Sequence, residues 1–256
     1  MEQRRLVSQA CFLALALAVP CSAAETAAGA PGLAALAGER LDYRVRWGVL
    51  SVADAVLEVE AAREGAVVLR ATARTRGWID PVYPVRDLVE STVDVAQLRP
   101  LRFHKRTKEG HGRPEVVDVE FDDEARLARY VEEGETREPL PLPDEYQDPL
   151  SCIYAYRVLA GGTDGAVSFE VTDGKRVIAG AFREVGRERV RTPAGEFDTV
   201  VVEPTIEGLG GVFRKSKKAQ LRIWFTDDAW RRPVRFYSEV AVGSFTMELT
   251  RLQGAE

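Results

Sequence analysis

The sequence predicts a mainly β protein, in which a curved antiparallel sheet, barrel or half-barrel of roughly a dozen strands packs around one buried α-helix at 148–160. Two observations support this prediction. Apolar and polar residues alternate with a period of two in short runs that turn residues separate, which is typical of strands with one buried face. One segment instead has the apolar spacing and the end signals of a helix.

The chain begins with features of an export signal. Basic residues at positions 4 and 5 precede an apolar stretch over 6–20, and small residues follow at 22–24. We therefore expect a secretory signal peptide at 1–24, cleaved after Ala24, and a periplasmic location. No later stretch is apolar for long enough to form a transmembrane helix.

Three further statements describe the organisation of the chain. Cys21 is a poor candidate for a lipoprotein anchor, because Pro20 stands where a small residue is expected before it. Residues 25–37 are rich in Ala, Gly and Pro and are predicted to be a flexible leader. Residues 38–252 are predicted to form a single mainly β domain.

Charge and cysteine content restrict the function further. The formal net charge is −5, and mild acidity disfavours nucleic acid as a partner. Cys11 and Cys21 leave with the signal peptide, so Cys152 has no intrachain disulfide partner. The fold must then be stabilised by its core.

The first strands are predicted as a meander. Alternation is clean over 41–47, 53–61 and 67–73, with turns at Gly48 and Gly65. Further strands are predicted at 89–95, 101–108, 116–121, 127–132, 167–172, 176–184, 188–192, 197–204, 221–225, 233–240 and 244–252.

An apolar, aromatic loop at 77–87 interrupts the strands. Pro81 and Pro84 are incompatible with a central strand. One interpretation is a loop packed onto the core. The other is a flap over an apolar cleft, in which Trp78, Tyr83 and Arg86 contact a ligand.

The predicted helix starts at Asp148, a good N-cap, followed by Pro149. Its spacing places Leu150, Ile153, Tyr154 and Arg157 on one face, and Cys152, Tyr156 and Leu159 on another. Because it is apolar around most of its circumference, we expect it to be buried. Tyr154 and Tyr156 are candidates for ligand contact where the helix does not fill the surrounding β shell.

The sequence offers little for catalysis or for metal binding. Cys152 lies near the helix N-terminus, but no histidine accompanies it in a recognised motif, and a buried core cysteine is the simpler interpretation. His104 and His111 are too few ligands for a metal site. We predict no enzyme activity, no cofactor and no metal.

A glycine-rich, then basic, loop at 207–218 carries Arg214, Lys215, Lys217 and Lys218. Its spacing does not match a phosphate-binding loop. It is either a solvated loop or a contact for anionic lipid headgroups or for an acidic partner.

Several stretches in this order resemble the bacterial domain-of-unknown-function family 3108, DUF3108. They are Tyr43–Gly48, Tyr83–Asp87, Leu101–Phe103, Asp148–Ser151, Pro193–Asp198, Trp224–Asp228 and Pro233–Arg235. The resemblance spans most of 38–252 and implies an exported envelope protein with no assigned activity. The strand pattern with a core helix is also similar, at the level of fold, to LolA-like periplasmic carriers of lipids and lipoproteins.

Three functions follow as expectations. The first is a non-catalytic periplasmic protein that binds an apolar ligand, a lipid or acyl chain, or a lipoprotein. The second is a structural or assembly factor that binds another envelope protein, which predicts a filled interior. The third is an envelope hydrolase, which requires a polar pocket with convergent carboxylates or Cys152 beside a histidine.

Overall fold

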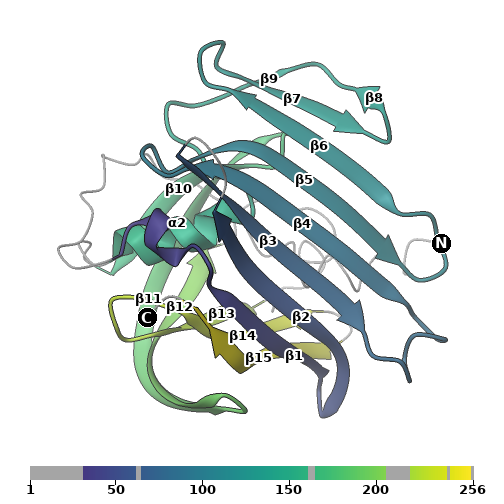
Figure 1. Ribbon diagram of the computed structural model, residues 1–256, viewed down its shortest axis with the longest axis vertical. Coiled ribbons are helices and arrows are strands. Elements are labelled where there is room, and N and C mark those ends of the chain that lie inside the picture. The colour runs from purple at the N-terminus through teal and green to yellow at the C-terminus, as the bar shows by residue number, and fades with distance from the viewer. Residues whose placement is uncertain (1–30, 62–64, 161–164, 206–219, 241–242, 255–256) are drawn as a thin grey trace.

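The computed structural model describes residues 31–61, 65–160, 165–205, 220–240 and 243–254. In this part of the chain, strands form one continuous antiparallel sheet (Figure 1). Its fifteen strands are β1 (Arg40–Trp47), β2 (Leu50–Ala61), β3 (Ala66–Thr75), β4 (Val85–Asp94), β5 (Arg99–Glu109), β6 (Glu115–Asp122), β7 (Leu127–Glu132), β8 (Glu135–Thr136), β9 (Leu140–Pro141), β10 (Ala166–Thr172), β11 (Val177–Thr192), β12 (Gly195–Thr205), β13 (Gln220–Thr226), β14 (Pro233–Val240) and β15 (Gly243–Gln253).

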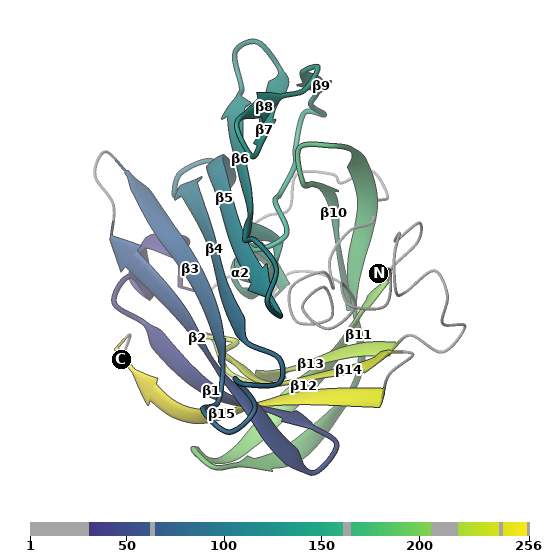
Figure 2. The same cartoon turned by 90° about the vertical axis from the view of Figure 1, so that its right-hand side faces the viewer.

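The strand order is simple. Strands β10 to β15 pair in sequence, β15 pairs with β1, and β1 to β8 continue in sequence, while β9 pairs with β7. Almost every pair of neighbouring strands is therefore consecutive in the chain, and the meander predicted for the first strands is confirmed as β1–β2–β3. The sheet curves strongly without closing, so it is an open half-barrel (Figure 2).

The segment before the helix spans the gap between the two ends of the sheet. Leu142 N–H donates to Arg126 O, which holds the segment to the β7 end. Gln147 N–H donates to Glu170 O at 2.7 Å, and Thr172 N–H donates to Gln147 O at 2.9 Å, which forms a parallel bridge to β10. The linker thus joins the two ends of the sheet although they do not pair directly.

Helix α2 (Ser151–Leu159) lies on the concave side of the sheet (Figures 1 and 2). It begins later than predicted, because Asp148 Oδ1 accepts the N–H groups of Leu150 and Ser151 in a turn before the helical hydrogen bonds start. The predicted buried helix is confirmed. Its two faces also separate as predicted, since Tyr154 joins one apolar cluster and Tyr156 another.

A buried ionic cluster holds the helix in place. Arg157 donates to both carboxylate oxygens of Glu39 at 2.6 and 2.8 Å, and its Nε donates to Trp230 O. Arg232 Nε lies 3.3 Å from the same carboxylate. Arg157 and Glu39 are both shielded from water. The cluster connects the helix to the start of β1 and to the β13–β14 turn.

Two boundaries differ from the sequence prediction. The predicted strands 176–184 and 188–192 form one strand, β11, which bends at a register shift between Glu184 and Gly186. Order also begins before residue 38, since Leu33 and Leu36, in a 3₁₀ turn, pack into the core. The predicted signal peptide at 1–24, with Cys21, lies outside the described residues.

Candidate functional site

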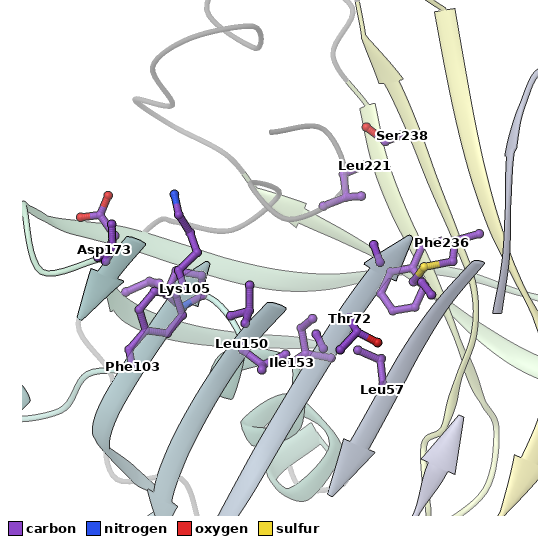
Figure 3. A pocket seen from close by; sticks show the side chains of 18 of the residues that line it. Leu57, Thr72, Phe103, Lys105, Leu150, Ile153, Asp173, Leu221, Phe236 and Ser238 are labelled. Atoms are coloured by element: carbon purple, nitrogen blue, oxygen red, sulfur yellow. The ribbon is translucent and has the colours of Figure 1, made fainter. Parts of the chain in front are cut away.

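A hollow lies on the concave side of the sheet, beside the N-terminal end of α2 (Figure 3). It offers about 190 Å³ of space to the centres of water molecules, many times what one water needs. Its walls are mostly aliphatic and aromatic and include Val45, Ala55, Leu57, Ala71, Ala73, Val89, Phe103, Val117, Leu150, Ile153, Val171, Ile223, Phe236, Phe245 and Met247.

Small residues at inward positions create this space. In the β2–β3 pair, Ala55 lies opposite Ala73, and Leu57 lies opposite Ala71. All four are buried and line the hollow. Directly opposed side chains on one face of a sheet fill the volume above it, so paired alanines leave that volume open.

Charged side chains line one side of the hollow where it opens to solvent, which we call the mouth. On β5 the inward positions are Phe103, Lys105 and Thr107, of which the first and last are buried. Lys105 Nζ lies 2.6 Å from Glu115 Oε1 on β6, and both residues line the hollow. An ion pair therefore stands at an inward position that neighbouring strands give to apolar side chains.

The β10–β11 turn adds further charge to the mouth. Gly174 has φ +84° and lies so close to Val119 and Tyr130 that a Cβ would come within 2.8–2.9 Å of their side chains. The turn carries Asp173, Lys175 and Arg176, which line the hollow.

Lys175 connects this turn to the other end of the sheet. Its Nζ lies 3.0 Å from Glu132 Oε1 and 4.8 Å from the centroid of the Tyr130 ring. The hydrogen bond from Lys175, supported by Arg137, lowers the pKa of Glu132 to about 2. Glu132 is therefore a carboxylate at neutral pH, and the mouth contains groups of both signs.

One polar atom in the wall has no partner. Ser238 is 6% exposed, and among the described residues its Oγ has no hydrogen-bond partner. Its side chain lies at the opposite side of the hollow from Asp173 and Lys105 (Figure 3). A buried hydroxyl without a partner carries an energetic cost, which a polar atom of a ligand would remove.

The arrangement is suited to binding an amphipathic molecule. The hollow has apolar walls for an apolar chain, and charged groups stand where it meets solvent. Ligand sites commonly combine a large apolar lining with a few polar groups that orient the ligand.

Three of the predicted ligand contacts lie on the β3–β4 tip or at the start of β4, and none is among the residues that line the hollow. Trp78 is 56% exposed, and its Nε1 donates to Ser51 O. Tyr83 OH donates to Glu109 Oε2 at 3.1 Å, and Arg86 pairs with Asp80.

The two predicted tyrosines are core residues of α2 and also lie outside the lining. Tyr156 packs on the rings of Phe182 and Phe225. Tyr154 lies near Arg157, whose guanidinium carbon is 5.3 Å from its ring centroid. Their role as ligand contacts stays a prediction, as does that of the three residues on the β3–β4 tip.

Cys152 and His104, two of the remaining candidates, lie in the described part of the chain. Burial raises the pKa of the Cys152 thiol well above its usual value. His104 Nδ1 lies 3.0 Å from Asp118 Oδ1, and no cluster of metal-ligating side chains occurs within the described ranges. Arg214, Lys215, Lys217 and Lys218 lie outside the residues that the structure describes.

Sequence reasoning missed the mouth and the alanines. A signal for the mouth exists, because Lys105 falls at an inward position between Phe103 and Thr107. Alternation over 53–61 and 67–73 places the alanines at 55, 71 and 73 on the inward face, but it predicts which face a residue occupies and not whether the space above it is filled.

Comparison with known proteins agrees with the fold. The described residues form an open β half-barrel that packs around helix α2. A similar solved structure is that of a β-barrel-like protein of the DUF1849 family from Brucella abortus. Its TM-score is 0.55 at 12% identity, with 85% of this chain and 98% of that chain covered. A hypothetical protein from Chlamydia trachomatis matches at 7% identity over 86% of this chain and 88% of that chain, with a TM-score of 0.37.

The family itself is clear. The chain belongs to DUF3108, a family described as protein of unknown function, whose model matches residues 42–250. The predicted family resemblance is thus confirmed. No curated protein matches the chain. In the described part of the chain, no helix is long and apolar enough to cross a membrane.

Proposed function

We propose that this protein binds an apolar ligand, a lipid or an acyl chain, in the cell envelope and does so without catalysis. The observation that carries the proposal is the apolar hollow beside α2 with charged groups at its mouth. An acyl chain would lie along the aliphatic walls, and its polar end would face Lys105 and the β10–β11 turn.

The chemistry of the walls favours a chain of methylene groups. Burying each methylene contributes about 0.8 kcal/mol, so a short acyl segment supplies enough free energy for binding. The lining is mostly apolar, whereas a sugar or a peptide would need more polar groups to hydrogen-bond with it.

Two sequence features support the envelope as the compartment. The basic and apolar start of the chain, followed by small residues, has the pattern of a signal peptide. The mild acidity of the chain is compatible with an exported, dissolved protein.

The hollow also favours ligand binding over the other two expected functions. A purely structural or assembly factor predicts a filled interior, whereas the interior here has about 190 Å³ open to water centres. A hydrolase requires convergent catalytic groups. Cys152 is fully buried, and His104, on β5, is occupied with Asp118.

The proposal is tested by filling the hollow. Ala71→Phe places a large ring in it, whereas Val68→Phe adds the same ring to the opposite face of the same strand. We expect Ala71→Phe to weaken binding of a fluorescent fatty-acid probe by at least about tenfold, because the ring occupies the site, and Val68→Phe to leave it unchanged.

Native mass spectrometry and lipid extraction of the protein purified from the periplasm provide the second measurement. A retained lipid in the wild type, absent from Ala71→Phe, is the expected result. If the wild type retains no ligand and binds no fatty-acid probe, the proposal is wrong. Circular dichroism establishes that both variants are folded.

A further inference from the structure

Large apolar side chains are exposed together at one edge of the molecule. Of the seven exposed in the described residues, five lie on two hairpin tips. The β1–β2 tip carries Trp47, Val49 and Leu50, and the β3–β4 tip carries Trp78 and Val82. We name these five residues the apolar rim.

The two tips are neighbours. Trp78 Nε1 donates to Ser51 O at 3.2 Å, and Arg76 N–H donates to Val52 O at 2.9 Å. Val49 is 82% exposed and Val82 is 71% exposed. Apolar side chains at this exposure on adjacent tips form a surface that is costly in water unless something covers it.

The apolar rim is continuous with the hollow. The Trp47 ring stacks on the Phe245 ring, with centroids 6.4 Å apart and an angle of 12° between the planes. Phe245 lines the hollow. Apolar surface therefore extends from the wall of the hollow to the exposed tips.

A third tip beside the apolar rim is basic. The β5–β6 tip packs against the β3–β4 tip through Gly110 N–H, which donates to Pro84 O at 2.8 Å. It carries Lys108, His111 and Arg113 together with one carboxylate, Glu109, which accepts a hydrogen bond from Tyr83 OH. Lys108 and Arg113 have no ion-pair partner among the described residues. Their charges are therefore available to an anionic surface.

We propose that these three tips dock the protein on an anionic lipid bilayer. Tryptophan, valine and leucine on convex tips can enter the interfacial layer, where tryptophan is favoured. Lys108 and Arg113 would lie beside anionic headgroups, to which each cation is attracted. Exposed apolar side chains next to these cations match the combination of an apolar interior and anionic headgroups in such a bilayer.

This docking goes beyond ligand binding, because it concerns the outer rim and not the hollow. It would hold the apolar surface that leads to Phe245 against the membrane. A protein with an empty hollow could still dock in this way. The two proposals can therefore fail independently.

Vesicle flotation of the full mature chain tests the docking. The vesicles consist of phosphatidylcholine alone or of phosphatidylcholine mixed with phosphatidylglycerol. The combined variant Val49→Ser, Trp78→Ser and Val82→Ser should lose at least about tenfold in affinity for the mixed vesicles, because apolar area at the interface sets the strength of partition.

The matched control is Leu101→Ser with Val185→Ser, which removes exposed apolar side chains away from the rim. It should float like the wild type. Lys108→Gln with Arg113→Gln should weaken binding to the mixed vesicles about tenfold and leave binding to phosphatidylcholine alone unchanged. Ala71→Phe should float normally, which separates docking from ligand binding.

Three outcomes would overturn the docking proposal. The wild type does not float with the mixed vesicles, or the rim variant floats as well as the wild type while its circular dichroism shows a folded protein. In the third outcome, sedimentation velocity shows a wild-type dimer that the rim variant abolishes. That result would make the rim an interface between two copies of this chain.

Discussion

The two sides of helix α2 differ in how they are packed. On one side Tyr156 contacts the rings of Phe182 and Phe225, with ring centroids 5.3 and 4.8 Å away. On the other side Leu150 and Ile153 face the hollow. One face of the helix thus packs against a filled core, and the other face borders open space.

The difference lies in the size of the opposing side chains. On the filled side, small helix residues such as Ala155 allow aromatic rings from the strands to approach. On the unfilled side, the strands present Ala55, Ala71 and Ala73, and the helix residues do not reach across. Both sides are apolar, so hydrophobicity alone does not separate a core from a ligand cavity.

Truncating a residue on each side should separate the two regions most strongly. Phe225→Ala should cost about 3–5 kcal/mol in free energy of unfolding, because it leaves a cavity in a filled core. Ile153→Ala should cost only about 1–2 kcal/mol, because its side chain already borders open space. Urea unfolding followed by circular dichroism measures both values, and equal costs would contradict the comparison.

Enlarging a residue on each side should again cost more on the filled side. Ala155→Leu should destabilise the protein by about 1–3 kcal/mol, since the filled side has no room for three more carbon atoms. Ala71→Leu should change the free energy of unfolding by less than about 0.5 kcal/mol or increase it, since the hollow accepts the side chain. Thermal unfolding of the two variants provides the measurement. A larger loss for Ala71→Leu would show that the hollow is filled in solution.

The smallest expected effect concerns Asp148, at the start of the helix that both regions share. Burial raises the pKa of Asp148 from 3.8 to about 6, although hydrogen bonds from Ser91 and from the N–H groups of Ser151 and Leu150 oppose the shift. The folded state then takes up a proton at a higher pH than the unfolded state does. The free energy of unfolding should therefore increase by about 1 kcal/mol as the pH falls from 7 to 5, and this contribution is lost as the pH rises through about 6.

Asp148→Asn should remove this part of the pH dependence, which urea unfolding at both pH values detects. Glu132→Gln is the control. The pKa of Glu132 is lowered to about 2, so its contribution is present above its unfolded pKa of about 4.5 and is lost only at more acidic pH. An identical slope for wild type and Asp148→Asn between pH 5 and 7 would exclude Asp148 as the titrating group.

Local patterns were enough to predict much of the fold. Alternation over 41–47 and 67–73 placed Leu41, Tyr43 and Leu69 on the buried face, where the structure has them. Asp148 and the apolar spacing after it predicted the helix and its two faces. The bend in β11 was not predicted, because the residues around Val185 and Gly186 are equally typical of a break between two strands.

The candidate site was less accessible from the sequence. Trp78 and Tyr83 are predicted ligand contacts because aromatic side chains in a loop often line ligand sites, yet neither is among the residues that line the hollow. Ser238 gave no signal at all, because a serine in a strand is ordinary. Its significance comes from burial without a partner.

The sequence by itself determined the β architecture and the core helix, because these depend on periodicity, caps and turn residues close together in the chain, and its family match is a property of the sequence too. Only the tertiary structure decided where the interior stays open. That outcome depends on which side chains meet across the strands, such as Ala55 with Ala73 in the wall of the hollow, and on the turn at Gly174 that brings Lys175 to Glu132. Packing of distant residues has no local pattern, so a cavity becomes visible only when the chain is folded.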